Sequence, residues 1–232
     1  MTTFRGEAEG VKRDVFPSTL NTWIDRRLDE GDGGRAEVNR HVMSVYAMPL
    51  RTYFLGTGDR WLGEADEVVQ GFFADRLDRP RFFADWQQAD MPLRRWLINA
   101  FCFYLKELRR RRWRDDRSGT LPDDPVVYEG NAERDFDRAF VASVVQRAME
   151  LARESCEADG LGEHWEVFTD HFCHDRAYAE LGPEHGVDAA RAAVMARTAS
   201  RRFRTAVREV LARDGGDERL DEQIRALVEN VQ

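Results

Sequence analysis

Nearly every stretch of the chain repeats its hydrophobic residues at intervals of three and four positions, which is the spacing of an α-helix. The segment "EADEVVQGFF" (64–73) puts five apolar residues on one side of such a helix: Ala65, Val68, Val69, Phe72 and Phe73. Alternation of apolar and polar residues between turn signals, the mark of a half-buried strand, is almost absent. The pattern therefore predicts an all-α fold.

The same periodicity gives the positions of the helices. They are expected at about 18–29, 36–55, 63–78, 92–113, 134–158, 162–173, 175–182, 188–212 and 218–230. The glycine-rich segments "EGDGG" and "GTGDR" separate the first three. Gly71 lies inside an expected helix, where glycine costs about 1 kcal/mol relative to alanine, so we expect another group to approach its backbone closely.

A segment without helical periodicity divides the chain. Residues 115–132, "DDRSGTLPDDPVVYEGNA", are rich in Pro, Gly and Asp, so we expect a flexible linker there. The 232 residues suffice for one large or two small domains. We therefore expect two helical domains at 16–114 and 133–213, a flexible N-terminus at 1–15 and a tail helix within 214–232.

Composition narrows the class of protein. Hydrophobic residues make up 42% of the chain and charged residues 34%, which is typical of a globular protein in solution. No apolar run approaches the roughly 20 residues that cross a bilayer. The polar N-terminus, "MTTFRGEAEGVKRD", is not a secretory signal, and three widely spaced cysteines give no disulfide framework. We expect a cytoplasmic protein without a membrane partner.

The net charge of −8 at first argues against a nucleic-acid ligand. The charges are unevenly distributed, however. Basic residues concentrate at 105–114 and 197–208, and acidic residues at 64–67, 115–137 and 214–222. Arginine supplies nearly all of the basic residues, which a GC-rich genome explains as easily as function does.

The helix expected at 92–113 has two contrasting faces. Its apolar face comprises Leu93, Trp96, Leu97, Ala100, Phe101, Tyr104, Leu105 and Leu108. The opposite face comprises Arg95, Asn99, Cys102, Lys106, Arg109 and Trp113, with Phe103 and Arg110 at the edge. Arginines can hold phosphates while rings stack on unpaired bases, which favours a single-stranded nucleic acid as ligand. The alternative is an ordinary solvated face whose aromatic residues pack on a neighbouring loop.

The segment "AYAELGPEHGVDAARAAV" predicts a helix-turn-helix, with Asp188 as the N-cap of its long second helix. Residues expected to face inward are Ala192, Ala196, Ala199, Phe203, Val207 and Val210. An outward basic stripe is expected from Arg197, Arg201, Arg204 and Arg208, with Arg191 near the leading end. Small residues (Ala189, Ala190 and Ala193) would let this helix enter a major groove. The alternative is a helical hairpin with a solvated arginine face.

Three blocks, "MPLRTYFLGTG", "EADEVVQGFFADRL" and "PLRRWLINAFCFYLKELRRRR", together resemble region 2 of a bacterial sigma factor. They are most similar to the extracytoplasmic-function (ECF) group, in the divergent branch familiar from planctomycetes. The helix-turn-helix segment and the residues up to Ala212 resemble region 4 of this family, and "ERLDEQIRALVENVQ" is similar to its trailing helix. The resemblance covers nearly the whole chain after residue 16.

The resemblance implies an alternative sigma factor that binds RNA polymerase core and recognises and opens promoters. The helix matching "EADEVVQGFF" would dock on the basic clamp helices of the largest polymerase subunit, through Glu64, Asp66, Glu67, Gln70 and Phe73. The flap of the second-largest subunit and promoter DNA, duplex and melted, would be further partners. Membership of this sigma-factor family would also allow a regulatory partner, such as an anti-sigma protein. Promoter affinity gained only within the holoenzyme would accord with the negative net charge.

The resemblance also assigns DNA contacts. Contacts to the minus-ten region would come from Arg95, Trp96, Asn99, Phe103, Lys106, Arg109, Arg110 and Trp113. Contacts to the minus-thirty-five region would come from Asp188, Ala189, Arg191, Ala193, Arg197, Arg201 and Arg202. Relatives commonly carry Asn at the position of Phe103 and often Lys at that of Ala193, so the promoter sequence cannot be carried over. Pro183 and His185 also depart from the family, so we expect the first helix of this motif to end at about Leu181.

Other classes of function have less support. The segment "HWEVFTDHFCHD" offers zinc-type ligands in His164, His171, Cys173 and His174, but no CxxC or HxxxH pair, so we expect no bound metal. The chain has no phosphate-binding loop, nucleophile elbow or HExxH motif, so we expect neither a cofactor nor an enzymatic activity. Two alternatives stay open: an adaptor that binds polymerase but is steered to DNA by another protein, and a helix-turn-helix regulator that is not a sigma factor.

Overall fold

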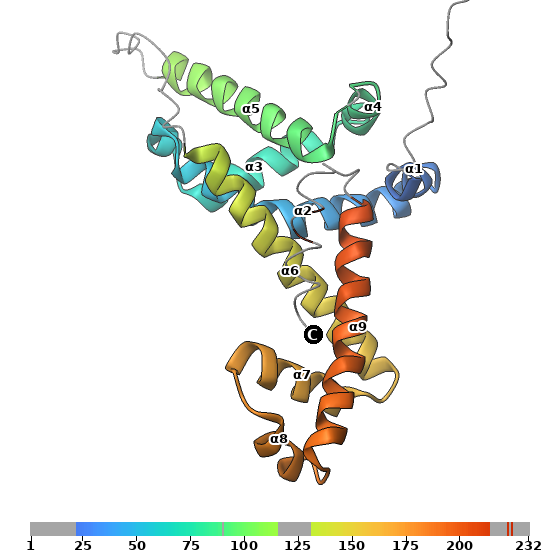
Figure 1. Cartoon of the computed structure of the whole chain (residues 1–232). Coiled ribbons are helices and arrows are strands. Elements are labelled where there is room, and N and C mark those ends of the chain that lie inside the picture. The colour runs from blue at the N-terminus through green and yellow to red at the C-terminus, as the bar shows by residue number, and fades with distance from the viewer. Residues whose placement is uncertain (1–21, 90, 116–130, 214–221, 223, 225–232) are drawn as a thin grey trace, which may run out of the picture.

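The computed structural model describes residues 22–89, 91–115 and 131–213, together with Glu222 and Ile224. This part of the chain is helical and contains no β-strand, which confirms the all-α prediction for it (Figure 1). The elements are α1 (Thr22–Asp29), α2 (Asp32–Leu55), the 3₁₀-helix η2 (Gly58–Leu62), α3 (Ala65–Leu77), α4 (Phe82–Gln87), α5 (Leu93–Asp115), α6 (Ala132–Ala158), α7 (Gly162–His174), α8 (Tyr178–Glu184) and α9 (Ala189–Arg213). None of the described helices is long and apolar enough to cross a membrane.

Several helix boundaries differ from those expected, and two of the differences have a local explanation. Helix α2 begins at Asp32, directly after Gly31, whose φ of 79° is a conformation that favours glycine and that ends the turn from α1. Helix α8 continues to Glu184, so the end expected at about Leu181 is wrong. A proline near the end of a helix removes only one amide donor, and the amide of His185 still bonds the carbonyls of Leu181 and Gly182, at 3.3 and 3.1 Å.

One helix was not expected from the sequence. Helix α4 has six residues, too few to show helical periodicity, and three of them are buried: Phe82, Phe83 and Trp86. The indole nitrogen of Trp86 donates to the carbonyl of Met91, 2.9 Å away, which secures the turn into α5. Helix α4 thus closes the core at the start of α5.

Helices α3 and α5 pack through a cluster of aromatic side chains. Phe72 lies edge-on to Phe101, with 5.1 Å between ring centroids, and 5.7 Å from Tyr104. A Cβ atom at Gly71 would lie only 2.6 Å from the hydroxyl of Tyr104. The close approach predicted at Gly71 is therefore confirmed, and it explains why a glycine stands in the middle of α3.

Helix α6 packs along α2, across the boundary expected between two domains. Phe140 lies 5.4 Å from Tyr46 and Phe136 lies 6.5 Å from Tyr53, measured between ring centroids, and all four side chains are buried. Arg94 adds an ion pair with Asp137 of α6, at 3.7 Å. The two-domain arrangement is not confirmed, because the described helices share one continuous core. The expected linker lies almost entirely outside the described residues, as do the N-terminus 1–15 and all of 214–232 except Glu222 and Ile224.

The second half of the fold is built on α9, which packs on α6, α7 and α8. Phe203 of α9 lies 5.9 Å from Phe168 of α7, between ring centroids. At its far end, the guanidinium of Arg213 lies 4.8 Å from the ring of Trp23 in α1. Helix α9 therefore extends from the turn after α8 to the N-terminal helices (Figure 1).

Candidate nucleic-acid interface

The outer face of α5 alternates cations with an exposed ring. Phe103 is 62% exposed, and the ammonium of Lys106 lies 5.3 Å from its centroid, close enough for a cation–π contact. Arg95, Asn99 and Arg110 are also exposed on this helix. Among the described residues no loop covers the ring of Phe103, which is presented to solvent in the geometry that base stacking requires.

Three of the residues predicted to contact minus-ten DNA are only partly accessible. Trp96 is half-buried and packs on Phe82, with 5.9 Å between ring centroids. Trp113 is half-buried as well. The guanidinium of Arg109 forms an ion pair at 3.5 Å with Asp59, which is buried. Trp96 and Arg109 therefore hold α5 against its neighbours as well as bordering its outer face.

An exposed aromatic residue beside α5 is not among those expected from the sequence. Trp61 in η2 is 58% exposed. Its neighbour Leu62 accepts a hydrogen bond from the guanidinium of Arg112, at 3.0 Å, which fixes η2 to the end of α5. The segment "GTGDRWLGEAD" could have revealed Trp61, because its many turn residues leave a tryptophan with few apolar neighbours at helical spacing.

Helix α3 presents the predicted polymerase-binding residues on its outer face, with one exception. Glu64, Glu67 and Gln70 are exposed, as is Asp66, whose carboxylate lies 3.0 Å from the guanidinium of Arg51. Phe73 is only 6% exposed and belongs to the core, as its place in the apolar row predicts, so it does not share the outer face with the other four. Phe73 forms part of a shallow hollow of about 400 Å³ between α2 and α3, lined by Asn39, Met43, Gln70, Phe73, Ala74, Leu77 and Asp78.

The helix-turn-helix has the expected cap and a tight turn. The carboxylate of Asp188 accepts a hydrogen bond from the amide of Arg191, at 2.7 Å, which confirms Asp188 as the N-cap of α9. Gly186 has a φ of 65°, a conformation that glycine adopts readily. A Cβ atom at Gly182 would lie 2.8 Å from the carbonyl oxygen of Val187, so glycine is needed for the turn to fold back on α8.

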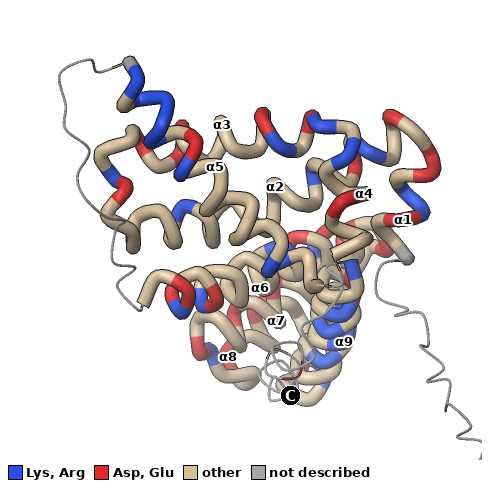
Figure 2. The backbone as a smooth tube through the Cα atoms, turned by 90° about the horizontal axis from the view of Figure 1, so that it is seen from above, with Lys and Arg blue, Asp and Glu red and all other residues tan. Residues whose placement is uncertain are grey.

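The predicted inward and outward faces of α9 agree with its burial. The buried residues include Ala192, Ala196, Ala199, Phe203, Val207 and Val210. On the outer face Arg191, Arg197, Arg201 and Arg208 are exposed, Arg204 and Ala193 are partly exposed, and Ala189 is exposed. Figure 2 shows basic positions along α9 and a second group at the end of α5.

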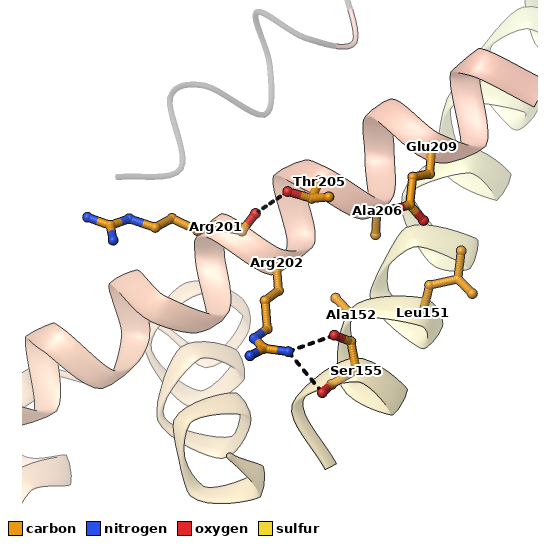
Figure 3. Close-up of a pocket in the computed structure, with 8 residues that line it drawn as sticks. All are labelled: Leu151, Ala152, Ser155, Arg201, Arg202, Thr205, Ala206 and Glu209. Atoms are coloured by element: carbon orange, nitrogen blue, oxygen red, sulfur yellow. Dashed lines mark hydrogen bonds between the residues drawn. The ribbon is translucent and has the colours of Figure 1, made fainter. Parts of the chain in front are cut away.

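Arg202 departs from its predicted role. Its guanidinium donates to the hydroxyl and the carbonyl of Ser155, at 2.7 and 3.0 Å (Figure 3). It also forms an ion pair with Asp159, at 2.7 Å. The neighbouring Arg201 points away from α6 (Figure 3). Arg202 therefore fastens α9 to α6, beside a shallow pocket of about 350 Å³, and the expectation that it is free to contact DNA is corrected.

Two of the histidines considered as metal ligands, His171 and His174, lie at the turn between α7 and α8 and make contacts there. His171 stacks on Tyr178, with 3.9 Å between ring centroids, and its Nδ1 lies 2.7 Å from the carbonyl oxygen of Arg176. The hydrogen bond with His174 and the contact with Arg176 hold the pKa of Asp170 below its usual range. No group of three or more potential metal ligands occurs among the residues that the structure describes.

No family model, curated protein or solved structure matches the chain. A functional proposal therefore depends on the geometry of these helices and on the sequence blocks themselves.

Proposed function

We propose that the chain is an alternative sigma factor of the ECF type, which binds RNA polymerase core and directs promoter recognition and opening. The observation that carries this proposal is the outer face of α5. Phe103 is 62% exposed beside Lys106, on a helix that ends in a run of arginines. An exposed ring between cations is suited to unpaired bases, whereas an intact duplex offers no free base face for stacking.

Helix α9 supplies the complementary duplex contact. Arg191, Arg197 and Arg201 are exposed, and the helix begins at a capped turn. Guanidinium groups without an accompanying aromatic ring suit phosphates and the major-groove edges of paired bases. Within this proposal α5 engages the opened minus-ten region and α9 engages the minus-thirty-five duplex.

Helix α3 supplies the contact to polymerase. Glu64, Glu67 and Gln70 are exposed on one side of a helix whose other side is packed in the core. Exposed carboxylates on a rigid helix complement a basic protein surface, and such pairing raises association rates and specificity. Gln70 is one of the residues that line the hollow between α2 and α3, so the surface is concave there.

The test is run-off transcription with the full chain and RNA polymerase core from the source organism. Its template is a promoter identified by sequencing transcript starts after overexpression of the chain. We expect initiation that depends on the chain. Binding to core without initiation would identify an adaptor instead. DNA binding without any affinity for core would identify a regulator that is not a sigma factor, and would overturn the proposal.

A further inference from the structure

Trp61 is exposed at a position that the proposed function does not use. Among the large apolar side chains that the structure describes, it is 58% exposed and only Phe103 is more so. An exposed tryptophan leaves a large apolar surface in contact with water, which is unfavourable. Exposed large aromatic side chains therefore often mark a surface that binds a ligand or partner.

The backbone on both sides of Trp61 is held in place. Leu62 accepts a hydrogen bond from Arg112, at 3.0 Å, and Asp59 forms its ion pair with Arg109, at 3.5 Å. The hydroxyl of Thr57 caps η2 by accepting a hydrogen bond from the backbone amide of Asp59, at 3.3 Å. Two arginines of α5 thus fix the short helix that carries Trp61, so the ring is presented with little conformational freedom to lose on binding.

Three arginines lie close to Trp61. Arg112 and Arg109 contact Leu62 and Asp59 of η2, and Arg60 is exposed next to Trp61 itself. This concentration of guanidinium groups repels a basic protein surface and attracts a polyanion. A ring held beside several phosphate-binding cations matches the chemistry of a nucleic acid with unpaired bases.

We propose that Trp61 is a second stacking platform, on a different face of α5 from Phe103, which binds an unpaired base beside phosphates held by Arg60 and Arg112. The inference rests on the proposed function for its assignment of the physiological strand to promoter DNA. Phe103 and Arg112 are nine residues apart, about two and a half helical turns, so they lie on opposite faces of α5. The Trp61 platform is therefore separate from that of Phe103.

The test is equilibrium binding of the full chain, alone and with polymerase core, to a labelled single strand of about 12 nucleotides. Trp61→Ala is expected to weaken binding about 5- to 150-fold, since stacking contributes roughly 1–3 kcal/mol per base. The salt dependence should stay unchanged because no phosphate contact is lost. Trp61→Phe should retain most of the affinity, and Met48→Ala, which removes another exposed apolar side chain, should bind like the unmodified chain.

The outcomes separate this inference from the proposed function. Equal binding by Trp61→Ala and the unmodified chain, including no binding by either, overturns the inference and leaves transcription to be judged by the run-off experiment. A Trp61-dependent affinity for single strands in a chain that does not bind core supports the inference and removes the sigma-factor proposal. Thermal unfolding followed by circular dichroism verifies that each variant is folded.

Discussion

At the scale of single residues, identical side chains in adjacent positions have different environments. Arg201 and Arg202 follow each other on α9, and a helix turns about 100° between them. Arg201 therefore points to solvent while Arg202 bonds Ser155 on α6 (Figure 3). The sequence gives both the same basic character, and only the position of α6 distinguishes them.

This pair gives a matched test. Arg201→Ala should weaken duplex DNA binding and reduce its salt dependence by about one phosphate, with stability changed by less than about 0.5 kcal/mol. Arg202→Ala should lower the free energy of unfolding by about 1–2 kcal/mol, because it removes charge-assisted hydrogen bonds between two helices. Urea denaturation and fluorescence anisotropy measure the two effects. Equal loss of DNA affinity in both variants, at unchanged stability, would contradict the assignment.

Asp59 gives a prediction about pH. Burial raises the pKa of Asp59, and the nearby Arg109 offsets only part of that increase. The folded state therefore binds a proton more tightly than the unfolded state. The stability contributed by this preference is present below the ordinary pKa of about 3.9 and is lost as the pH rises through the raised value. Asp59→Asn should remove this dependence, so the stability of the variant relative to the unmodified chain should increase from acidic to neutral pH.

Urea denaturation at several pH values measures this difference for Asp59→Asn. Asp78→Asn, at an exposed position at the end of α3, reports the background effect of exchanging a surface aspartate. If Asp59→Asn instead became less stable relative to the unmodified chain toward neutral pH, the ion pair with Arg109 would outweigh the cost of burial.

At the scale of elements, the contact between α3 and α5 is set by a glycine. Alanine in the place of Gly71 would gain about 1 kcal/mol of helix propensity, but its Cβ would lie 2.6 Å from the Tyr104 hydroxyl. Tyr104 is packed against Phe72 and Phe101 and has little room to move. Overpacking of this kind costs about 1–3 kcal/mol, so Gly71→Ala should destabilise the chain.

Tyr104→Phe provides the matched background, because it removes the clashing oxygen and keeps the ring. In that background Gly71→Ala should be neutral or stabilising by up to about 1 kcal/mol. Chemical denaturation of the four chains completes the double-mutant cycle. A coupling free energy near zero would mean that the hydroxyl does not set the distance between α3 and α5.

The outer face of α3 gives a further prediction about binding. Glu67→Arg should weaken the affinity for polymerase core, and the loss should grow as salt is lowered, because the attraction is Coulombic and screened. Glu163→Arg makes the same charge change on the exposed surface of α7 and should have a much smaller effect. Core affinity measured across a salt series distinguishes the two, and equal losses at every salt concentration would argue against docking through α3.

At the scale of the whole molecule, periodicity predicted most helices but not their partners. A row of apolar residues shows that one face of a helix is buried, but it does not show which other helix packs against that face. Periodicity does not show that Phe136 and Phe140 pack on α2, so it predicts a separate domain for α6. The same limit applies at the candidate site, because no pattern in the sequence indicates that η2 and Trp61 lie beside α5, about 50 residues away in the chain.

The shared core predicts shared stability. Phe140→Ala should lower the free energy of unfolding by about 3–5 kcal/mol, because the side chain is buried between α2, α6 and Arg94. Hydrogen exchange should show reduced protection in α3 and α9 together, since both depend on the same core. Loss of protection confined to α6 and α9 would instead indicate two independently stable units.

The contact between Arg213 and Trp23 holds the C-terminal end of α9 against α1. The 25 residues of α9 are about 37 Å long, with the capped turn at one end and α1 at the other. A tilt of about 5° at the Trp23 end would displace the capped turn by about 3 Å, close to the rise of one base pair. Within the proposed function, the contact of Trp23 with Arg213 would thereby affect the spacing between the promoter elements that α5 and α9 contact.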